Sequence, residues 1–538
     1  MSLRWPKFGR KTCWLLGAVA LCVCVRFSLE LAFRAGPSHA VPTAPTERKW
    51  LPDNALARFK HPHRVFRVAF APDGKTLVTG TYDRRDGPSN FDPSLWGWDL
   101  KTKEKVFAFP CHDGRLLSLT ISPDGTTVAT VGEGGGLIRF WDLPGKKASA
   151  GLGHDIHGNY CVTFSPSGKL LAAVARDTVR VWEVATGRIL QQWTWPAACR
   201  VAFSPDDNVL ACVGGNVGMV FWDTGSGKKL FEGDLTGGNG ISLVFSPDGQ
   251  VVATGGNSVV QLSHVPSGVE RSRFGKRIPY LAFSPNGRML ASGGVLDGTG
   301  DKAVHLWEVA TGKERGRFEG HDEHILDVAF SPRGQLLASG SEDRTAIVWD
   351  LAARDQGQVR LTGEDGLELW KALASEDAAE AYAAIRKLTA AGPEAVPFIK
   401  EHLLKVLVGT QPMTSREVAV WIKNLNSDDP AVRQKALADL EQDGEAVLPI
   451  LRHSLQQKPA NAAYRQVELL VQLLPKQSSF LNKKPYSSED LRMLRALEVL
   501  ENIGTPAAQE VMQLLSQRAP DLRLAHEAMA ALRRSTGR

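Results

Sequence analysis

The sequence predicts a multidomain protein, in which an all-β body of seven similar units is followed by an all-α region and preceded by an apolar segment. Three observations predict this order. A turn signature recurs seven times at intervals of about forty residues, helical spacing of apolar residues begins after Leu361, and an apolar run occupies residues 13–25. With 538 residues, of which 43% are hydrophobic and 23% charged, the chain is long enough for two or three domains.

The N-terminal segment has the layout of a secretion signal, because four basic residues ending at Lys11 precede the apolar run. Extension to Phe33 gives about twenty residues, enough to span a membrane, although Arg26 interrupts the run. We expect a signal or an uncleaved membrane anchor that contacts the membrane through residues 13–33. Since positive charge stays in the cytoplasm, the body would be exported to the periplasmic or extracytoplasmic face, and secreted if the signal is cleaved. A buried amphipathic helix of the folded domain is the alternative.

The formal net charge of +6 is located in this same part of the chain. Residues 1–50 hold eight Lys or Arg against two Glu, so the other residues sum to about zero. A neutral body provides no surface that neutralises phosphates, and we expect no nucleic-acid partner.

The turn signature reads Phe-Ser-Pro-Asp-Gly at residues 245–249. The seven copies begin at Phe70, Ile121, Phe164, Phe203, Phe245, Phe283 and Phe330. Each copy closes a β-hairpin, because Pro sets the first turn dihedral, Asp or Asn bonds back to the backbone, and Gly accepts a positive φ. A period of about forty residues is typical of β-propeller blades. Seven blades of four strands would close into a ring without a long exposed sheet edge.

A second marker, Trp followed by an acidic residue, stands about nineteen residues after most of these positions. The pairs are Trp98-Asp99, Trp141-Asp142, Trp182-Glu183, Trp222-Asp223, Trp307-Glu308 and Trp349-Asp350. The fifth unit departs from the pattern, with Ser263 and His264 at these places. Apolar and polar residues alternate around the pairs, which predicts strands.

On these residues the chain, from 54 to 361, closely resembles the WD-repeat family of β-propellers. In that family four side chains of a blade, called the structural tetrad, form a buried hydrogen-bond chain. The seventh unit matches the tetrad with His321, Ser339, Asp343 and Trp349, and the first unit with His61, Thr79, Asp83 and Trp98. The second unit lacks the acid, and the third has Ala173 in place of the hydroxyl. A buried hydrogen bond to a charged group contributes about 1.5 to 3 kcal/mol. The resemblance therefore implies that units one and seven are the stiffest and unit five the weakest.

Closure of the ring needs one strand from the other end of the propeller. We expect residues 55–60 to complete the blade that begins near Ile325, and residues 358–362 are the competing candidate.

The region after residue 361 has helical spacing. Three segments share a pattern of Ala, an apolar residue, Leu and Gly: Ala384-Ile385, Leu388 and Gly392; Ala436-Leu437, Leu440 and Gly444; Ala496-Leu497, Leu500 and Gly504. Ala528-Met529 and Leu532 nearly repeat it. The first three positions share a helix face, and the Gly ends the helix. The region resembles HEAT-type helical repeats, and a plain helical bundle is the alternative. The predicted domains are thus 1–34 (signal or anchor), 35–53 (Pro-rich linker), 54–361 (propeller) and 362–538 (helical tail).

Motifs for catalysis, cofactors or metals are not found in the sequence. Gly74-Lys75-Thr76 follows a hairpin turn and has Ala69 where a phosphate-binding loop needs Gly. Two pairs of His, one of them including His321, are spaced three residues apart but have no further ligands at regular spacing. The four Cys after the N-terminal segment have no CxxC spacing and are expected to be buried free thiols. We expect no catalytic, cofactor-binding or metal-binding residue.

Two insertions mark a candidate partner-binding rim. They lie between the second and third strands of units one and six, hence on the same face, and units six and one flank unit seven in a ring. The rim residues are Arg84, Arg85, Phe91, Asp297 and Asp301. Functional loops are commonly carried by rigid scaffolds. Tolerated surface insertions are the alternative.

These features together predict a non-catalytic protein–protein interaction scaffold, tethered to the membrane through its N-terminus. The resemblance implies protein partners but does not identify them, because fold does not fix function. Two alternatives are an exported propeller enzyme, either a hydrolase or an oxidoreductase, and a propeller that senses a small ligand or glycan.

Overall fold

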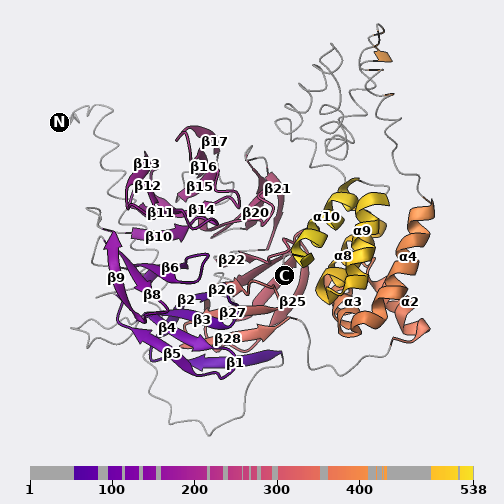
Figure 1. Ribbon diagram of the computed structural model, residues 1–538, viewed down its shortest axis with the longest axis horizontal. Helices are drawn as coiled ribbons and strands as arrows, with labels where there is room; N and C mark the ends of the chain where they lie inside the picture. The colour runs from indigo at the N-terminus through magenta and orange to yellow at the C-terminus, as the bar shows by residue number, and fades with distance from the viewer. Residues whose placement is uncertain are drawn as a thin grey trace, which may run out of the picture. The chain divides into compact units, whose positions relative to one another are not determined.

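The computed structural model describes residues 54–82, 95–111, 116–132, 137–152, 159–214, 218–233, 240–256, 259–265, 268, 270–275, 280–293, 301–351, 361–409, 420, 424, 427, 429, 431–432, 486–518 and 522–536. The strands in these ranges form seven four-stranded antiparallel sheets, which are the blades of a β-propeller (Figure 1). In each blade the strand before the Phe-Ser-Pro-Asp-Gly turn is first, and consecutive strands pair with one another. The predicted seven-bladed fold is confirmed.

The blades follow the chain order. Blades one to three are β2 (Arg64–Phe70), β3 (Thr76–Tyr82), β4 (Leu95–Asp99) and β5 (Lys105–Phe109); β6 (Leu116–Ile121), β7 (Thr127–Gly132), β8 (Ile138–Asp142) and β9 (Lys147–Leu152); and β10 (Asn159–Phe164), β11 (Leu170–Ala175), β12 (Thr178–Glu183) and β13 (Ile189–Thr194). Blades four and five are β14 (Ala198–Phe203), β15 (Val209–Gly214), β16 (Gly218–Asp223) and β17 (Lys229–Gly233); and β18 (Gly240–Phe245), β19 (Val251–Gly256), β20 (Val260–His264) and β21 (Glu270–Phe274). Blade six is β22 (Tyr280–Phe283), β23 (Met289–Gly293), β24 (Val304–Glu308) and β25 (Glu314–Phe318), and blade seven is β26 (Ile325–Phe330), β27 (Leu336–Ser341), β28 (Thr345–Asp350) and β1 (Ala55–Lys60).

Blade seven closes the ring with a strand from the start of the propeller. β1 pairs antiparallel with β28, and Phe59 stands opposite Ala346 in the register. The prediction that residues 55–60 complete this blade is confirmed. Most of the competing segment, residues 358–360, lies outside the described residues.

Hairpin turns of neighbouring blades contact one another around the disc. In blade five Gly249 has φ +71°, and a Cβ atom there would meet the ring of Pro205 in the turn of blade four at 3.2 Å. In blade four Asp207 occupies the glycine place with φ +64°. Its carboxylate accepts a hydrogen bond from Ser165 Oγ, 3.0 Å away in the turn of blade three. The turn signature therefore closes each hairpin and also sets the contact with the preceding blade.

Each inner strand has a polar or sulfur-containing residue three positions before the first residue of the turn signature: Arg67, Ser118, Cys161, Arg200, Ser242, Tyr280 and Asp327. Burial raises the pKa of Tyr280 in blade six, and the charges of Arg67 in blade one and Arg200 in blade four oppose the shift, so side chains of these three blades lie within electrostatic range of one another. The Asp327 carboxylate accepts a hydrogen bond from the Val68 backbone N–H of the next blade, at 3.0 Å. Burial raises the pKa of Asp327 above its usual range, although the charge of Arg67 opposes the shift.

The helical region contains α2 (Gly363–Ala372), α3 (Ala378–Ala390), the short 3₁₀ helix η1 (Gly392–Glu394), α4 (Ala395–Gly409), α8 (Ser488–Ile503), α9 (Pro506–Arg518) and α10 (Leu522–Thr536). Ser487 and Asp490 form a capping box at the start of α8, and Gly504 ends it with φ +65° and an N–H bonded to the Leu500 carbonyl oxygen. The predicted helix stop at Gly504 is confirmed. The second patterned segment, 436–444, lies outside the described residues.

Most of the predicted helix face is buried. Ala384, Ile385 and Leu388 in α3, like Ala496, Leu497 and Leu500 in α8, are at most 2% exposed. The prediction for Met529 in α10 is wrong, because its side chain is 41% exposed and points away from this core.

The helices share a hydrophobic core with the propeller. Leu388 and Leu500 from the helices belong to the same buried cluster as Met289 of blade six and Trp349 and Leu351 of blade seven. The helices therefore pack directly on these two blades (Figure 1). Burial of apolar surface is the main favourable term in such packing.

Strand direction assigns the loops to two faces of the disc. Because neighbouring strands are antiparallel, the turns after the first and third strands of a blade lie on one face, and the connection after the second strand lies on the other. The third-strand turn of blade six begins at Glu308, on the face that the helices contact. The strand ends that flank the two insertions, Tyr82 and Leu95 in blade one and Gly293 and Val304 in blade six, lie on the opposite face.

Candidate functional site

Blade seven contains a complete hydrogen-bond chain among the four side chains named from the resemblance. His321 Nε2 lies 2.7 Å from Ser339 Oγ, and His321 Nδ1 lies 2.8 Å from Asp343 Oδ2. The Trp349 indole N–H donates to the same Ser339 oxygen at 2.8 Å. Burial alone would raise the pKa of Asp343, but the hydrogen bond and charge of His321 lower it to about 2. This chain joins the loop before β26 to β27 and β28.

Blade one has the same chain in its described part. His61 Nε2 lies 2.8 Å from Thr79 Oγ1, and the Trp98 indole N–H lies 3.1 Å from that oxygen. Burial lowers the pKa of His61 to about 4, so its imidazole is neutral near pH 7. The acid named for this blade, Asp83, lies outside the described residues.

Blade five forms all four strands without the Trp and acid pair. Ser263 and His264, which replace them, are both buried, and the Gln261 side-chain amide donates to Ser263 Oγ at 3.1 Å. The expectation that this blade is the weakest stays a prediction.

Among the five rim residues, Asp301 is the one that lies in the described part of the chain; Arg84, Arg85, Phe91 and Asp297 lie outside it. Asp301 Oδ2 is 2.9 Å from His305 Nε2, and Asp301 Oδ1 accepts from the Ala303 backbone N–H at 3.0 Å. It lines a shallow recess of about 430 Å³ together with Arg317 and His321. The structure thus brings one rim residue next to the hydrogen-bond chain of blade seven.

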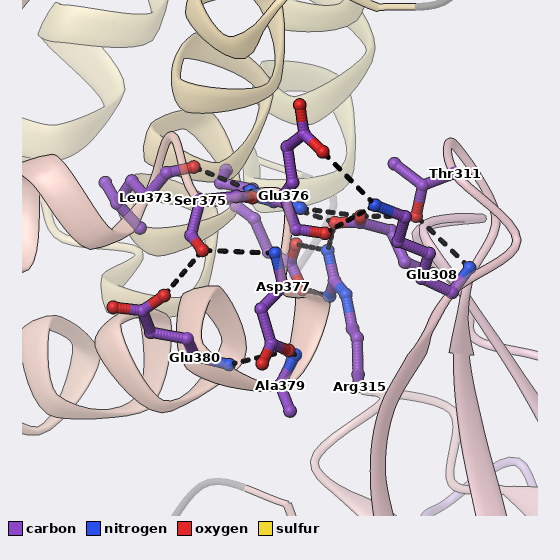
Figure 2. Close-up of polar contacts among 12 residues, drawn as sticks. Glu308, Thr311, Arg315, Leu373, Ser375, Glu376, Asp377, Ala379 and Glu380 are labelled. Carbon is purple, nitrogen blue, oxygen red and sulfur yellow. Dashed lines mark hydrogen bonds and ion pairs between the residues drawn. The ribbon is translucent and has the colours of Figure 1, made fainter.

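A cluster of four buried charges, which sequence reasoning missed, joins blade six to the helices (Figure 2). We call Glu308, Arg315, Arg495 and Glu498 the junction cluster; each side chain is 2% exposed. Arg315 of β25 donates to Glu308 Oε1 at 2.8 Å and to both oxygens of Glu498, on α8, at 2.8 and 2.9 Å. Arg495, also on α8, donates to both oxygens of Glu308 at 2.9 and 2.7 Å. Positive and negative groups therefore alternate across the junction.

Backbone carbonyl groups and a threonine hydroxyl add further hydrogen bonds to the junction cluster. Arg495 Nη1 donates to the carbonyl oxygens of Leu373 and Ser375, at 2.8 and 2.7 Å, in the segment between α2 and α3. The Thr311 hydroxyl donates to Glu308 Oε2 at 2.8 Å (Figure 2). One arginine thus connects blade six, α8 and the α2–α3 connection.

The junction cluster favours the charged forms of Glu308 and Arg315. Burial alone would raise the pKa of Glu308, but the charge of Arg315 and the hydrogen bonds and charge of Arg495 lower it to about 2. Burial opposes the charge of Arg315, yet Glu498 and Glu308 raise its pKa well above the usual range. Removing one member of such a set leaves an uncompensated buried charge, which costs about 3 to 5 kcal/mol. The cluster therefore connects the helices to blade six through contacts that are costly to break singly.

A sequence signal for the junction cluster exists in α8. Arg495 and Glu498 follow Leu491 by four and seven residues, so charged residues stand on the apolar face of that helix. Charged side chains are rarely fully buried unless they are paired. This departure indicates partners, but it does not say which element supplies them.

The comparisons with known proteins match the propeller. Residues 54–85, 103–142, 150–183, 275–308 and 312–350 match the family described as WD domain, G-beta repeat. The propeller of this chain therefore contains WD repeats. The matches begin at β1 and end at β28; they include the whole hydrogen-bond chain of blade seven and, from that of blade one, His61 and Thr79.

Three relatives of this WD-repeat protein illustrate the likeness. It is 27% identical over 332 residues to nuclear distribution protein PAC1 of Arthroderma otae, covering 59% of this chain and 63% of that protein. It is 26% identical over 239 residues to eukaryotic translation initiation factor 3 subunit I of Aspergillus fumigatus, covering 44% and 62%. It is 25% identical over 256 residues to the transcriptional corepressor LEUNIG_HOMOLOG of Arabidopsis thaliana, covering 46% and 30%. The chain thus spans less than two thirds of the length of each relative.

These names also correct one prediction. The expected localisation, a membrane-anchored protein with an exported body, is contradicted, because the names of these relatives refer to transcription, translation and nuclear distribution and not to exported proteins. Within the described ranges no helix is both long and apolar enough to cross a membrane. The prediction rested on an apolar run that Arg26 interrupts, and residues 1–34 lie outside those ranges.

The comparisons bring in no catalytic family. In the part of the chain that the structure covers, no three His, Cys, Asp or Glu side chains are grouped as a metal site would require. The four Cys there are free, as expected; Cys111, Cys161 and Cys212 are buried and Cys199 is half-buried.

Proposed function

We propose that this WD-repeat protein is a non-catalytic scaffold that binds other proteins. The observation that carries the proposal is the junction cluster, which joins blade six to the helices, while a shared apolar core also packs them against blade seven. Two of the relatives are named as a subunit of a translation factor and as a corepressor, and such proteins act together with other proteins. A rigid platform with two kinds of surface is suited to hold two partners at a fixed separation.

The partner-binding rim is part of this proposal. It comprises Arg84, Arg85, Phe91, Asp297 and Asp301; the described strand ends that flank the two insertions lie on the face opposite the helices. Support comes from Asp301, which lies beside His321 of blade seven in a shallow recess. The hydrogen-bond chains of blades one and seven would keep the neighbouring strands rigid, so that the rim loops start from fixed ends.

We further propose that the propeller ends near residue 361 and that the helical tail consists of HEAT-like repeats. The support is the shared burial pattern of α3 and α8, in which the Ala, apolar and Leu positions face the same core. The Gly after each of these helices has positive φ, at Gly392 and Gly504.

The test is a pull-down with the full chain, followed by mass spectrometry of the captured proteins. The double variant Arg84→Glu/Arg85→Glu should lose at least one specific partner, because a reversed charge repels a surface that the wild type attracts. The control is Arg188→Glu, which alters an exposed arginine after the third strand of blade three. Loss of no partner would remove the rim from the proposal, and absence of any specific partner of the wild type would overturn the scaffold role.

A further inference from the structure

A pocket of about 270 Å³ lies between the propeller and the helices, beside the junction cluster. Its propeller side consists of the first-strand turns of blades six and seven, including Asn286 and Arg333, together with Leu351. Its helical side comes from α3, α8 and α10, including Arg386, Glu501 and Arg534. Propeller turns and helices that are distant in the sequence thus line one cavity.

Arg333 departs from a hydrogen-bond pattern that the other six propeller turns share. In the other six turns the side chain at this position accepts a hydrogen bond from the backbone N–H two residues later; the acceptors are Asp73, Asp124, Ser167, Asp206, Asp248 and Asn286. A guanidinium group has donors alone and cannot replace them. Arg333 is exposed and forms no ion pair with a described residue. The departure occurs in the turn that faces the helices, and a residue that breaks a local rule is a candidate functional residue.

The opposite wall of the pocket offers donors that have no acceptor. Arg386 Nε and Thr389 Oγ1 are buried atoms without a hydrogen-bond partner among the described residues. Arg386 uses one other nitrogen, Nη2, to reach Asn54 Oδ1 at 3.2 Å. Buried donors in folded proteins are almost always satisfied, by the protein or by something that binds it.

The acidic residues that line the pocket are already paired. Glu498 accepts from Arg315, and Glu501 accepts from Arg534 at 2.7 and 3.0 Å. Arg333 and Arg386 are therefore the charges of this pocket that lack a carboxylate partner within the described residues. The unpaired charge of the pocket is therefore positive, and Leu351 and Ile385 form part of the pocket wall.

We propose that this pocket binds the carboxylate side chain of an acidic, partly apolar peptide segment of a protein partner. Arginine binds carboxylates through paired N–H donors, and Arg333 and Arg386 would supply these from opposite walls. The apolar lining suits an aliphatic residue next to the acid, and the volume suits one or two side chains. The inference rests on the proposed scaffold role but concerns a surface on the face opposite the rim.

The test uses the full chain and an array of eight-residue peptides that contain one to three Asp or Glu among Leu and Phe. A matched set carries Asn and Gln at the acidic positions, and a third set carries phosphoserine there. We expect binding to a subset of the acidic peptides and at least tenfold weaker binding of their amide counterparts, since a charge-assisted hydrogen bond is lost.

Arg333→Asp is the decisive variant, because it restores the acceptor present in the other turns and should fold at least as well as the wild type. It should weaken binding of the acidic peptides at least tenfold, as should Arg386→Gln, whereas Arg188→Glu should not. Equal binding of acidic and amide peptides, unchanged binding by Arg333→Asp, or binding of the phosphoserine set alone would overturn the proposal. Loss of the pull-down partners through the rim variant, with peptide binding unchanged, would show that the two surfaces act separately.

Discussion

Blades three and six contain the same six residues, Trp-Glu-Val-Ala-Thr-Gly, at positions 182–187 and 307–312. The local structures are also the same. Thr186 Oγ1 donates to Glu183 at 2.6 Å and Thr311 Oγ1 donates to Glu308 at 2.8 Å, while the two glycines have φ +70° and +68°. The six residues therefore form the same turn in both blades.

The surroundings of the two glutamates differ. Glu183 is half-buried, whereas Glu308 is 2% exposed and accepts hydrogen bonds from Arg315 and Arg495. The third residue after the glycine is Leu190 in blade three and Arg315 in blade six. The comparison teaches that the six shared residues determine how the glutamate is held in its turn. The residue in the next strand and the contact with the helices determine whether that glutamate connects the propeller to the helical region.

The largest effect is expected when Arg315 is replaced by its blade-three counterpart, as Arg315→Leu. Glu498 then loses both of its hydrogen bonds from Arg315 while it stays buried. The free energy of unfolding should fall by about 3 to 5 kcal/mol, the cost of an unpaired buried charge. Urea unfolding of the full chain, monitored by circular dichroism, measures the change.

The matched control is the double variant Arg315→Leu/Glu498→Leu, which removes both members of the pair. It should recover most of the lost stability, because replacing a buried pair by apolar residues of similar volume is often neutral. A loss below about 1 kcal/mol in the single variant would show that the helices are not held through Arg315.

A somewhat smaller effect is expected for Glu308→Gln compared with Glu183→Gln. The amide keeps the shape but removes the charge between Arg315 and Arg495, so Glu308→Gln should cost about 2 to 3 kcal/mol. Glu183→Gln should cost less than about 0.5 kcal/mol, because a partly exposed turn acid contributes little. Equal losses in both variants would mean that the turn, and not the junction, determines the cost.

The pH dependence of unfolding tests the burial and pairing of Glu308 in a second way. The pKa of Glu308 is lowered from 4.5 to about 2, so its contribution is fully present above pH 4.5 and is lost as the pH falls towards 2. The shift corresponds to roughly 3 kcal/mol. Stability measured from pH 6 to pH 2 should therefore fall less steeply in Glu308→Gln than in the wild type. Parallel curves for the wild type and Glu308→Gln would contradict this assignment.

The difference between the two blades also explains what the sequence could predict. The turns, which recur in all seven blades, and the Trp and acid pairs, which recur in six, follow from local chemistry, and the closing strand follows from the need to complete blade seven; the structure confirms the blades and the closing strand. The junction cluster does not repeat, because Glu308 stands in the same six residues as Glu183 but gains Arg315 from the next strand and Arg495 from α8, nearly two hundred residues later. Arg495 and Glu498 on an apolar helix face indicate a buried polar contact, but their partner is set by tertiary packing. The rim is predicted from the length of two loops. A long loop marks a departure from the repeat, but it does not show which residues or partners the loop contacts.

Blade seven extends the comparison to the hydrogen-bond chain inside a blade. Ser339 bonds both His321 and Trp349, while its blade-six counterpart Ser292 accepts from Trp307 at 2.8 Å. Blade three has Ala173 at this place. Ser339→Ala should cost about 2 kcal/mol and Ser292→Ala about 1 kcal/mol, in proportion to the buried groups that lose a partner. Unfolding midpoints in urea measure both, and a larger loss for Ser292→Ala would contradict the ranking.

The smallest effect is expected for Lys313→Ala, at the residue that follows the six shared residues in blade six. Lys313 Nζ also reaches the helical region, where it donates to the Glu376 carbonyl oxygen at 2.8 Å (Figure 2). Its side chain is 52% exposed and that of Glu376 is 85% exposed, so water competes for both groups and the contact contributes little. Lys313→Ala should change the free energy of unfolding by less than about 0.5 kcal/mol, like Arg188→Ala at the same place in blade three. If Lys313→Ala destabilises the protein as much as Arg315→Leu, the number of contacts across the junction determines its strength; if the change is small, burial of the charges determines it.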